Sequence, residues 1–279
     1  MMAVGQGVRM REQKDFNLEE AGAVQLVQEL QIAGLCCMVV LPQDYESGLQ
    51  RYPVLYVNGE IPIIEVMTEL RKAGVSPGFM ILSVKPDSWN DDFTPWSAPA
   101  FRKGETAPQG RAKDYIRRLT EEIKPYMDAN YRTKPEPAYT ALSGYSLGGL
   151  TALYSMYLTN CFGWICSLSG SLWYDGFCEF VEEERPLRQN VNVYLSLGKK
   201  ERLSRNQRMG KVAECTEKVR QTLEAQLGRP QAEKTGKAGG QNGTDERGRA
   251  GEVCLEWNEG GHFHETAKRF VRAILWWNG

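Results

Sequence analysis

The chain has 279 residues, of which 42% are hydrophobic and 25% are charged, and its formal net charge is −1. This length suits one α/β domain with a full core. A nearly neutral charge without a basic stripe excludes a nucleic-acid-binding protein, and no apolar run is long enough to span a membrane. The seven scattered cysteines are typical of a reducing compartment, and residues 1–20 carry no apolar signal-peptide segment, so we expect a cytoplasmic protein.

Strand-like apolar runs alternate with helix-like segments along the chain. The expected strands are Cys36–Leu41, Val54–Val57, Phe79–Val84, Tyr139–Leu142, Trp164–Leu168, Val191–Leu197 and Val253–Trp257. The expected helices are Ile63–Ala73, Ala112–Asn130, Leu150–Tyr157, Gln207–Leu227 and Glu265–Trp277. This alternation predicts a single α/β domain over residues 1–279, with a mostly parallel central sheet and helices on both faces.

Two segments stand apart from this alternation. Residues 1–33 precede the first expected strand and are interpreted as an N-terminal extension. Residues 228–251 are rich in glycine and charge, and they separate a helix from the final strand. Such a composition buries too little apolar surface to order itself, which predicts a flexible surface insertion; a lid or a docking segment is the alternative.

A Gly-x-Ser-x-Gly pentapeptide, Gly144–Gly148, lies between an expected strand and an expected helix. A nucleophile elbow requires this context, because its sharp turn exposes the hydroxyl of Ser146 and leaves no room for side chains two residues before and after it. The alternative is a chance turn, since glycine and serine are common turn residues. An acid and a histidine that follow in chain order would favour the elbow.

The choice of histidine is narrow, because the chain has only two, His262 and His264, and both follow the serine. His262 falls on the loop after the last expected strand, where a general base belongs. His264 directly precedes the closing helix and is typical of a cap or a solvent-facing residue. A metal held by this pair is a further alternative, but no third histidine, HExxH motif or paired CxxC motif supplies more ligands, so we expect no metal.

Position alone selects the acid. Glu201 follows the expected strand Val191–Leu197 and projects from its carboxyl end, where it would orient the imidazole. Asp175, after the preceding strand, is the second choice, and a Ser/His dyad without a carboxylate is the third. A Lys-Lys-Glu-Arg run also suits an ordinary solvated charged face.

Beyond the pentapeptide, several stretches carry a resemblance to a known family. They are Val40-Leu41-Pro42, Tyr52–Gly59, Asp92–Trp96, Ile123–Tyr126, Asn130–Thr133, Leu168–Trp173, Leu195–Gly198 with Glu201, and Gly260–Phe263. In these the chain resembles the putative esterase family of the α/β-hydrolase superfamily, the group with esterase D and the enterochelin and bacillibactin siderophore esterases. The resemblance implies the α/β-hydrolase fold and a serine hydrolase of carboxylic esters, with Ser146 as nucleophile and His262 as base. The separate N-terminal domain of some enterochelin esterases has no room in this chain.

An acyl-transfer mechanism also needs backbone donors for the developing oxyanion. The residue after the nucleophile, Leu147, would supply one N–H. The turn after the strand Val54–Val57 would supply the second, from Gly59 or Glu60, because hydrolases place a donor there. An ordinary β-turn is the alternative for Gly59 and Glu60.

Aromatic residues near the elbow predict the substrate pocket. Trp173, Trp96 and Tyr145 are expected at its mouth, where they would suit aryl, sugar or siderophore esters. The alternative is that these side chains are core or loop anchors.

The sequence therefore predicts a serine esterase with the triad Ser146, His262 and Glu201, a small-molecule ester as its partner and no cofactor. A catalytically silent binding or scaffold protein of the same fold is the rival hypothesis. Intact nucleophile and base residues argue against it, because a binding protein has no physical need for them. An acyltransferase would share the triad and pass the acyl group to an alcohol other than water.

Overall fold

The structure is a computed structural model that describes residues 26–227 and 251–278. Residues 1–25 of the expected N-terminal extension, 1–33, lie outside the described residues. The expected insertion, residues 228–251, lies outside them up to residue 250. Within the described ranges, no helix combines the length and apolar character needed to cross a membrane.

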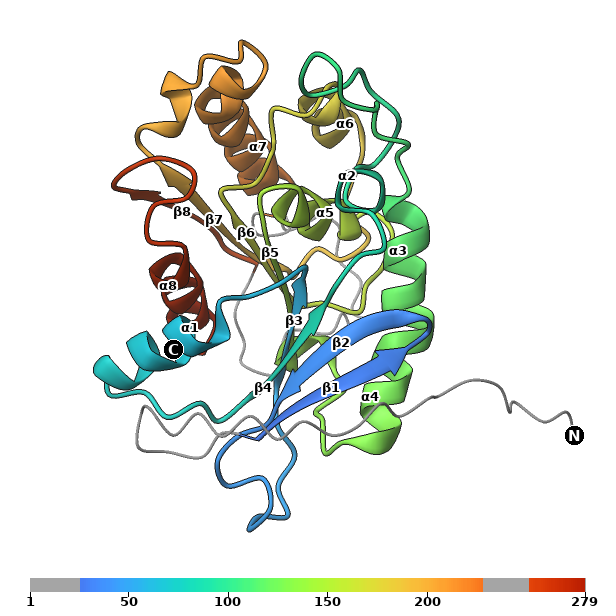
Figure 1. Ribbon diagram of the computed structural model, residues 1–279, viewed down its shortest axis with the longest axis vertical. Coiled ribbons are helices and arrows are strands. Elements are labelled where there is room, and N and C mark those ends of the chain that lie inside the picture. Colours follow the sequence, from blue (N-terminus) through green and yellow to red (C-terminus); the bar gives the residue numbers. More distant parts are fainter. Residues whose placement is uncertain (1–25, 228–250, 279) are drawn as a thin grey trace, which may run out of the picture.

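An eight-stranded sheet with the order β1-β2-β4-β3-β5-β6-β7-β8 forms the centre of the molecule (Figure 1). Its strands are β1 (Val27–Ile32), β2 (Leu35–Val40), β3 (Val54–Asn58), β4 (Met80–Val84), β5 (Thr140–Tyr145), β6 (Trp164–Leu168), β7 (Asn192–Gly198) and β8 (Val253–Asn258). β1 and β2 run antiparallel to their neighbours, and the other strands are parallel. The expected mostly parallel sheet is therefore confirmed.

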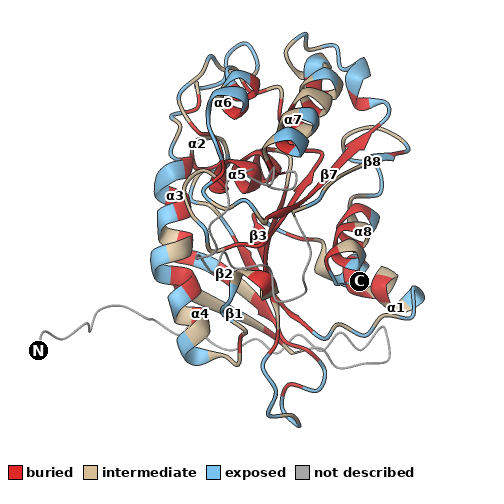
Figure 2. Ribbon diagram, turned by 180° about the vertical axis from the view of Figure 1, so that it is seen from behind, coloured by how far each residue is buried: buried red, intermediate tan, exposed pale blue. Residues whose placement is uncertain are grey.

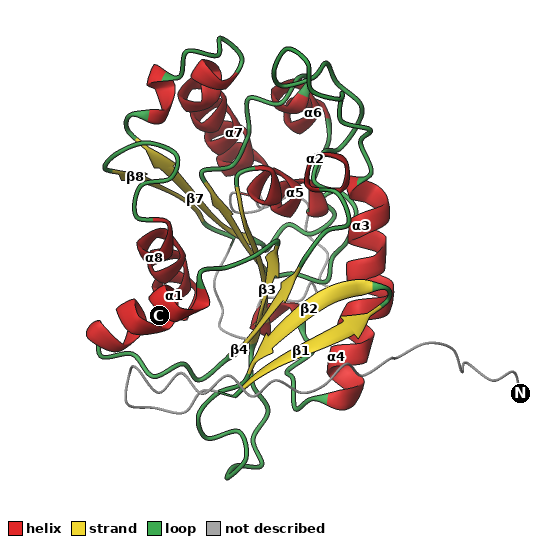
Figure 3. Ribbon diagram, viewed as in Figure 1, coloured by secondary structure: helices red, strands yellow, loops and turns green. Residues whose placement is uncertain are grey.

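Helices cover both faces of the sheet (Figure 3). They are α1 (Ile63–Lys72), α2 (Trp89–Asp92), α3 (Ala112–Arg118), α4 (Lys124–Asn130), α5 (Leu147–Ser155), α6 (Phe177–Glu183), α7 (Val212–Leu227) and α8 (Thr266–Asn278). α1 and α8 pack on one face, and α3 to α7 pack on the other. Side chains of the central strands alternate between the two cores. In β3, for example, Val54 and Tyr56 face one core while Leu55 and Val57 face the other. β3 is therefore buried along its whole length (Figure 2).

β1 is the strand that the sequence pattern did not predict. It is a half-exposed edge strand with polar residues, and it pairs with β2 through a turn in which Ala33 and Gly34 have φ of 52° and 76°. Positive φ at both central residues is the geometry of a type I′ hairpin, which usually carries Asn-Gly. Because alanine is not a typical turn residue, the sequence does not predict this hairpin. Residues 27–32 belong to the sheet and not to an extension.

The expected helix Ala112–Asn130 is continuous but changes pitch in its middle. A π-helical turn, Leu119–Ile123, joins α3 to α4. Pro125 follows this turn and has no N–H to offer to the preceding helical turn, so the wider turn accommodates it. α7 begins at Val212 and not at Gln207, after a 3₁₀ turn at Met209–Lys211. The short helices α2 and α6 were missed because they are too short for a periodicity to be read.

Candidate active site

Ser146 lies on a sharp turn between β5 and α5. Its φ of 56° and ψ of −119° are strained for a residue with a side chain, and its N–H donates to the Leu168 carbonyl at 3.0 Å on the neighbouring strand. This hydrogen bond anchors the turn to the sheet. The backbone thus has the strand–turn–helix geometry of a nucleophile elbow.

Glycines permit the turn because its two arms nearly touch. A Cβ at Gly144 would lie 2.3 Å from the carbonyl carbon and oxygen of Gly148. A Cβ at Gly148 would lie 2.7 Å from the carbonyl oxygen of Asn58, at the end of β3. Neither position has room for a side chain, so both glycines of the pentapeptide have a steric cause.

Glu201 and His262 meet above the carboxyl ends of β7 and β8. Nδ1 of His262 lies 2.7 Å from Oε2 of Glu201. The carboxylate occurs in the 3₁₀ turn Glu201–Leu203, directly after β7, and the imidazole is on the loop between β8 and α8. This contact leaves Nε2 as the free ring nitrogen, the arrangement in which an acid orients a histidine base.

The Glu201 carboxylate is buried and densely hydrogen-bonded, with only 8% of the residue exposed. Its Oε1 accepts hydrogen bonds from the Gly198 N–H at 2.7 Å, the Ser169 hydroxyl at 2.7 Å and the Arg269 guanidinium at 2.9 Å. Burial on its own raises the pKa of Glu201, but the hydrogen bonds from His262, Ser169 and Gly198 outweigh it and hold the pKa below its ordinary value of 4.5. The carboxylate therefore remains ionised at neutral pH.

Ser146 and His262 line the same cavity of about 260 Å³, together with Glu201. Among the described residues, the Ser146 hydroxyl contacts the hydroxyl of Ser171 at 3.2 Å, and it makes no hydrogen bond to the imidazole. In unliganded enzymes, the bond from nucleophile to base is often long and tightens only when substrate binds. The three residues are thus brought to one cavity, with only the acid–histidine contact formed.

The alternative site residues lie elsewhere. Asp175 forms an ion pair with Arg208 and makes no hydrogen bond to an imidazole within the described structure. His264 is exposed, and its ring nitrogen lies 3.8 Å from the Glu265 carboxylate. The geometry favours Glu201 and His262 over both.

The N–H groups of the three candidate oxyanion donors differ in whether they already have a hydrogen-bond acceptor. Leu147 is the first residue of α5, a position whose N–H has no partner within the helix. The Gly59 N–H donates to the Val84 carbonyl at 2.8 Å, so this amide is already engaged. In the part of the chain that the structure describes, the N–H of Glu60 has no acceptor. Of the three, Leu147 and Glu60 therefore have an N–H group that is not already engaged.

Of the three aromatic residues expected in the pocket, only Trp173 lines the cavity. Trp96 packs against Tyr154 and Phe180, and its indole donates to the Asp175 carbonyl at 2.8 Å, which makes it an anchor for the loop before α6. The hydroxyl of Tyr145 donates to the His262 carbonyl, so this residue supports the histidine loop from behind.

Further residues complete the lining of the cavity. Met209, Val212 and Phe263 supply apolar surface to the cavity, and Ser169, Ser171, Ser204 and Arg102 supply polar groups. Ser169 and Ser171 belong to the Ser-Gly-Ser stretch after β6, whose position at the carboxyl end of a strand next to β5 was a usable signal. No signal in the sequence singles out Met209 or Val212, because they reach the cavity from the 3₁₀ turn before α7 and from the first residue of α7.

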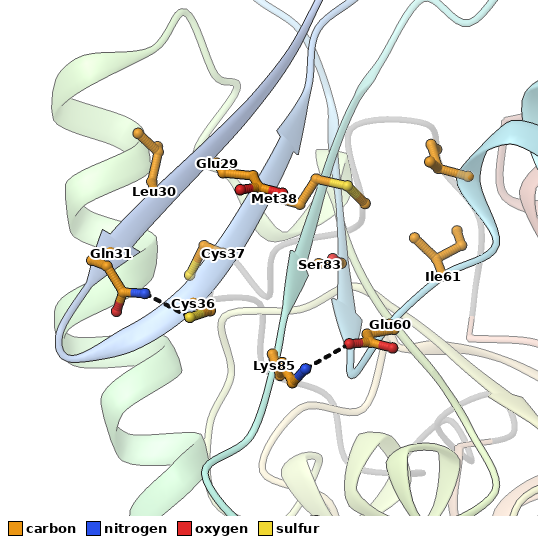
Figure 4. Close-up of a pocket in the computed structure, with 11 residues that line it drawn as sticks. Glu29, Leu30, Gln31, Cys36, Cys37, Met38, Glu60, Ile61, Ser83 and Lys85 are labelled. Atoms are coloured by element: carbon orange, nitrogen blue, oxygen red, sulfur yellow. Dashed lines mark hydrogen bonds and ion pairs between the residues drawn. The ribbon is translucent and has the colours of Figure 1, made fainter. Parts of the chain in front are cut away.

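A larger cavity of about 450 Å³ lies on the β1–β2–β4 part of the sheet (Figure 4). Its lining includes the thiol of Cys36, which accepts a hydrogen bond from Gln31 at 2.5 Å, and its border carries the Glu60–Lys85 ion pair. Neither Ser146 nor either histidine lines this cavity, whereas Ser146 and His262 both line the smaller one. The smaller cavity is therefore the candidate active site.

Comparisons of amino-acid sequence identify relatives of this chain. Residues 35–241 match the family model described as "Putative esterase". The chain is also similar to YbbA of Bacillus subtilis (strain 168), described as an uncharacterized protein. The two are 24% identical over 246 residues, which are 86% of this chain and 90% of YbbA.

Solved structures with the same fold include several hydrolases. An IroE-like serine hydrolase from Shewanella oneidensis matches with a TM-score of 0.69 and 16% identity, over 90% of this chain and 78% of that one. Siderophore hydrolase EstA from Aspergillus nidulans matches with a TM-score of 0.63 and 16% identity, over 93% and 96%. The enterobactin esterase FES from Shigella flexneri matches with a TM-score of 0.64 and 13% identity, over 90% and 58%. These similarities confirm the expected α/β-hydrolase fold.

Proposed function

Because the chain belongs to the Putative esterase family and is an ester hydrolase, we propose that it works through a Ser146–His262–Glu201 triad and a covalent acyl-enzyme. The observation that carries this proposal is the 2.7 Å contact between Glu201 and His262 at the cavity that Ser146 lines. A strained serine, an oriented imidazole and a buried carboxylate in one cavity form the constellation that acyl transfer requires.

In the proposed first half-reaction, Nε2 of His262 accepts the Ser146 proton while Oγ attacks the ester carbonyl carbon. The resulting tetrahedral intermediate collapses when His262 donates this proton to the leaving alkoxide, so an alcohol departs and the acyl group stays on Ser146. In the second half, His262 deprotonates a water that attacks the acyl-enzyme. The carboxylic acid leaves and the proton returns to Ser146. Glu201 remains ionised throughout and stabilises the transient imidazolium.

The carbonyl oxygen gains negative charge in both halves. We propose that the N–H groups of Leu147 and Glu60 donate hydrogen bonds to this oxyanion. Leu147 begins α5, and the Glu60 N–H has no acceptor in the described residues. The positive end of the α5 dipole adds to this stabilisation.

The lining of the cavity supports small carboxylic esters as substrates. Trp173, Met209, Val212 and Phe263 surround a volume of about 260 Å³ with apolar and aromatic surface. This surface fits an aromatic or short apolar acyl group better than a long chain. Two solved structures of the same fold are described as a ferulic acid esterase and a siderophore hydrolase. We include siderophore esters and acylated-sugar esters with an aryl group in the proposed class.

Turnover of p-nitrophenyl acetate by matched variants tests the proposal. We expect the native protein to release nitrophenol enzymatically, and Ser146→Ala and His262→Ala to lose at least about a thousandfold in kcat/KM. His264→Ala is the control, because it removes the neighbouring imidazole without touching Glu201; its rate should match the native one. Equal loss in the His262 and His264 variants would overturn the assignment of the base.

A further inference from the structure

Arg269 is a charged residue at a buried position where apolar side chains usually pack. It lies on α8 beside Phe270 and Val271, at the interface with the sheet, and its side chain is 0% exposed. An apolar side chain of similar volume often stabilises such a buried position as well as an ion pair does. Stability alone therefore does not explain an arginine here, and its partners identify a more specific role.

The guanidinium first contacts the acid of the proposed triad. Nη1 of Arg269 donates to Oε1 of Glu201 at 2.9 Å, while the other carboxylate oxygen faces His262. Nη1 also donates to the hydroxyl of Ser169, which itself donates to Oε1 of Glu201. These bonds fix the rotation of the carboxylate, so that Oε2 stays aimed at the imidazole.

The same guanidinium also holds the backbone on both sides of the histidine. Nη2 donates to the Gly261 carbonyl at 2.8 Å, which is the peptide group before His262. Nη1 donates to the Tyr145 hydroxyl at 3.1 Å, and this hydroxyl donates to the carbonyl of His262 itself. One side chain thus connects the acid, the histidine loop and the residue that precedes Ser146.

The backbone leaves room for this guanidinium. A Cβ at Gly198 would lie 2.7 Å from Nη2 of Arg269 and 2.9 Å from Oε1 of Glu201. β7 therefore ends in the residue that permits the contact between arginine and acid.

We propose that Arg269 is the positioning residue of the active site, which sets the Glu201 carboxylate and the His262 loop in their catalytic geometry. The inference rests on the proposed triad. Arg269 does not line the cavity, so it acts through Glu201 and His262 without touching substrate. Its loss should lower kcat and leave KM nearly unchanged, because small displacements of catalytic groups slow the chemical step more than they weaken binding.

Arg269→Met and Arg269→Lys test the role, with Arg272→Met as the control. Arg272 lies one turn further along α8 and pairs with Asn258 and Glu256, away from the triad. For p-nitrophenyl acetate, we expect kcat of Arg269→Met to fall roughly a hundredfold, and the lysine to recover part of that loss. Arg272→Met should stay within about twofold of native. Thermal unfolding establishes that each variant is folded at the assay temperature, and Arg269→Lys carries the test if Arg269→Met does not fold.

A double-mutant cycle separates positioning from a merely structural role. In a Glu201→Gln background the acid is already lost and only the support of the His262 loop remains, so replacing Arg269 should lower kcat by about tenfold or less, against roughly a hundredfold with the acid present. Equal and additive losses in both backgrounds, or a lower Tm with unchanged kcat, would overturn the inference alone. Absence of turnover in the native protein would overturn the proposed function and the inference with it.

Discussion

Glu201 presents one carboxylate oxygen to His262, with Oε2 at 2.7 Å from Nδ1, and turns the other into the protein interior. Because the interior oxygen has its own donors, the carboxylate cannot rotate away from the imidazole without losing them. This division of the two oxygens gives the acid a single orientation. This single orientation and the tight turn that carries Ser146 both have measurable consequences.

Glu201→Gln should lower kcat by roughly a thousandfold to ten-thousandfold, because an amide can present its NH₂ to Nδ1 and stabilise the wrong imidazole tautomer. The measurement is steady-state hydrolysis of a nitrophenyl ester. Glu259→Gln is the control, since Glu259 is exposed and pairs with Lys199. A loss of similar size in the control would contradict the assigned role of Glu201.

The lowered pKa of Glu201 predicts a pH-dependent contribution to stability. A carboxyl group whose folded-state pKa is below its ordinary value of 4.5 stabilises the fold above that pH, and this contribution is lost as the pH falls through the folded-state pKa. The difference in free energy of unfolding between native protein and Glu201→Gln should therefore be larger at pH 6 than in the acid range. Urea unfolding at both pH values measures it; a constant difference would argue against the lowered pKa.

Gly144→Ala should destabilise the elbow. Its Cβ would overlap the Gly148 backbone, which cannot move without displacing Ser146, so the free energy of unfolding should fall by about 1–3 kcal/mol and esterase activity with it. Gly78→Ala is the matched control, because nothing lies within 4 Å of the added carbon. Chemical denaturation compares the two. An equally stable Gly144→Ala protein would show that the turn has more room than its geometry indicates.

Replacing Trp173 should change the acyl preference of the enzyme, whereas replacing Trp96 should lower its stability. Trp173→Ala removes aromatic surface from the cavity, and we expect kcat/KM for aryl-acyl esters to fall roughly three- to tenfold more than for acetyl esters. Trp96→Ala removes a ring packed against Tyr154 and Phe180, so it should lower stability by up to about 3–5 kcal/mol and leave acyl preference unchanged. Kinetics on paired esters and thermal unfolding measure these effects, and a change of preference in Trp96→Ala would contradict the assignment.

The positions of the main residues of the candidate site could be predicted from the sequence because their signals are local. The elbow around Ser146 is a turn with its own glycines, and His262 was selected from only two histidines by its position after the last strand. Glu201 followed from the end of a strongly apolar strand. Each of these residues stands where a parallel strand ends, which the hydrophobic pattern locates well.

The sequence pattern did not indicate that Arg269 is buried next to the candidate triad. In the sequence it is one charged residue in a helix that also carries Lys268 and Arg272, and such residues usually face solvent. Only the tertiary arrangement of β5, β7 and the histidine loop buries it. Tyr145 was expected in the pocket but does not line the cavity. The sequence does not reveal that its hydroxyl turns toward the His262 carbonyl.

The most direct test of the account is the mass of the intact protein after treatment with a fluorophosphonate, compared between the native chain and Ser146→Ala. The account predicts one phosphonyl adduct on the native protein and none on the variant, because only an activated serine attacks this reagent. An unmodified native protein, or an equal adduct on Ser146→Ala, would contradict Ser146 as the nucleophile.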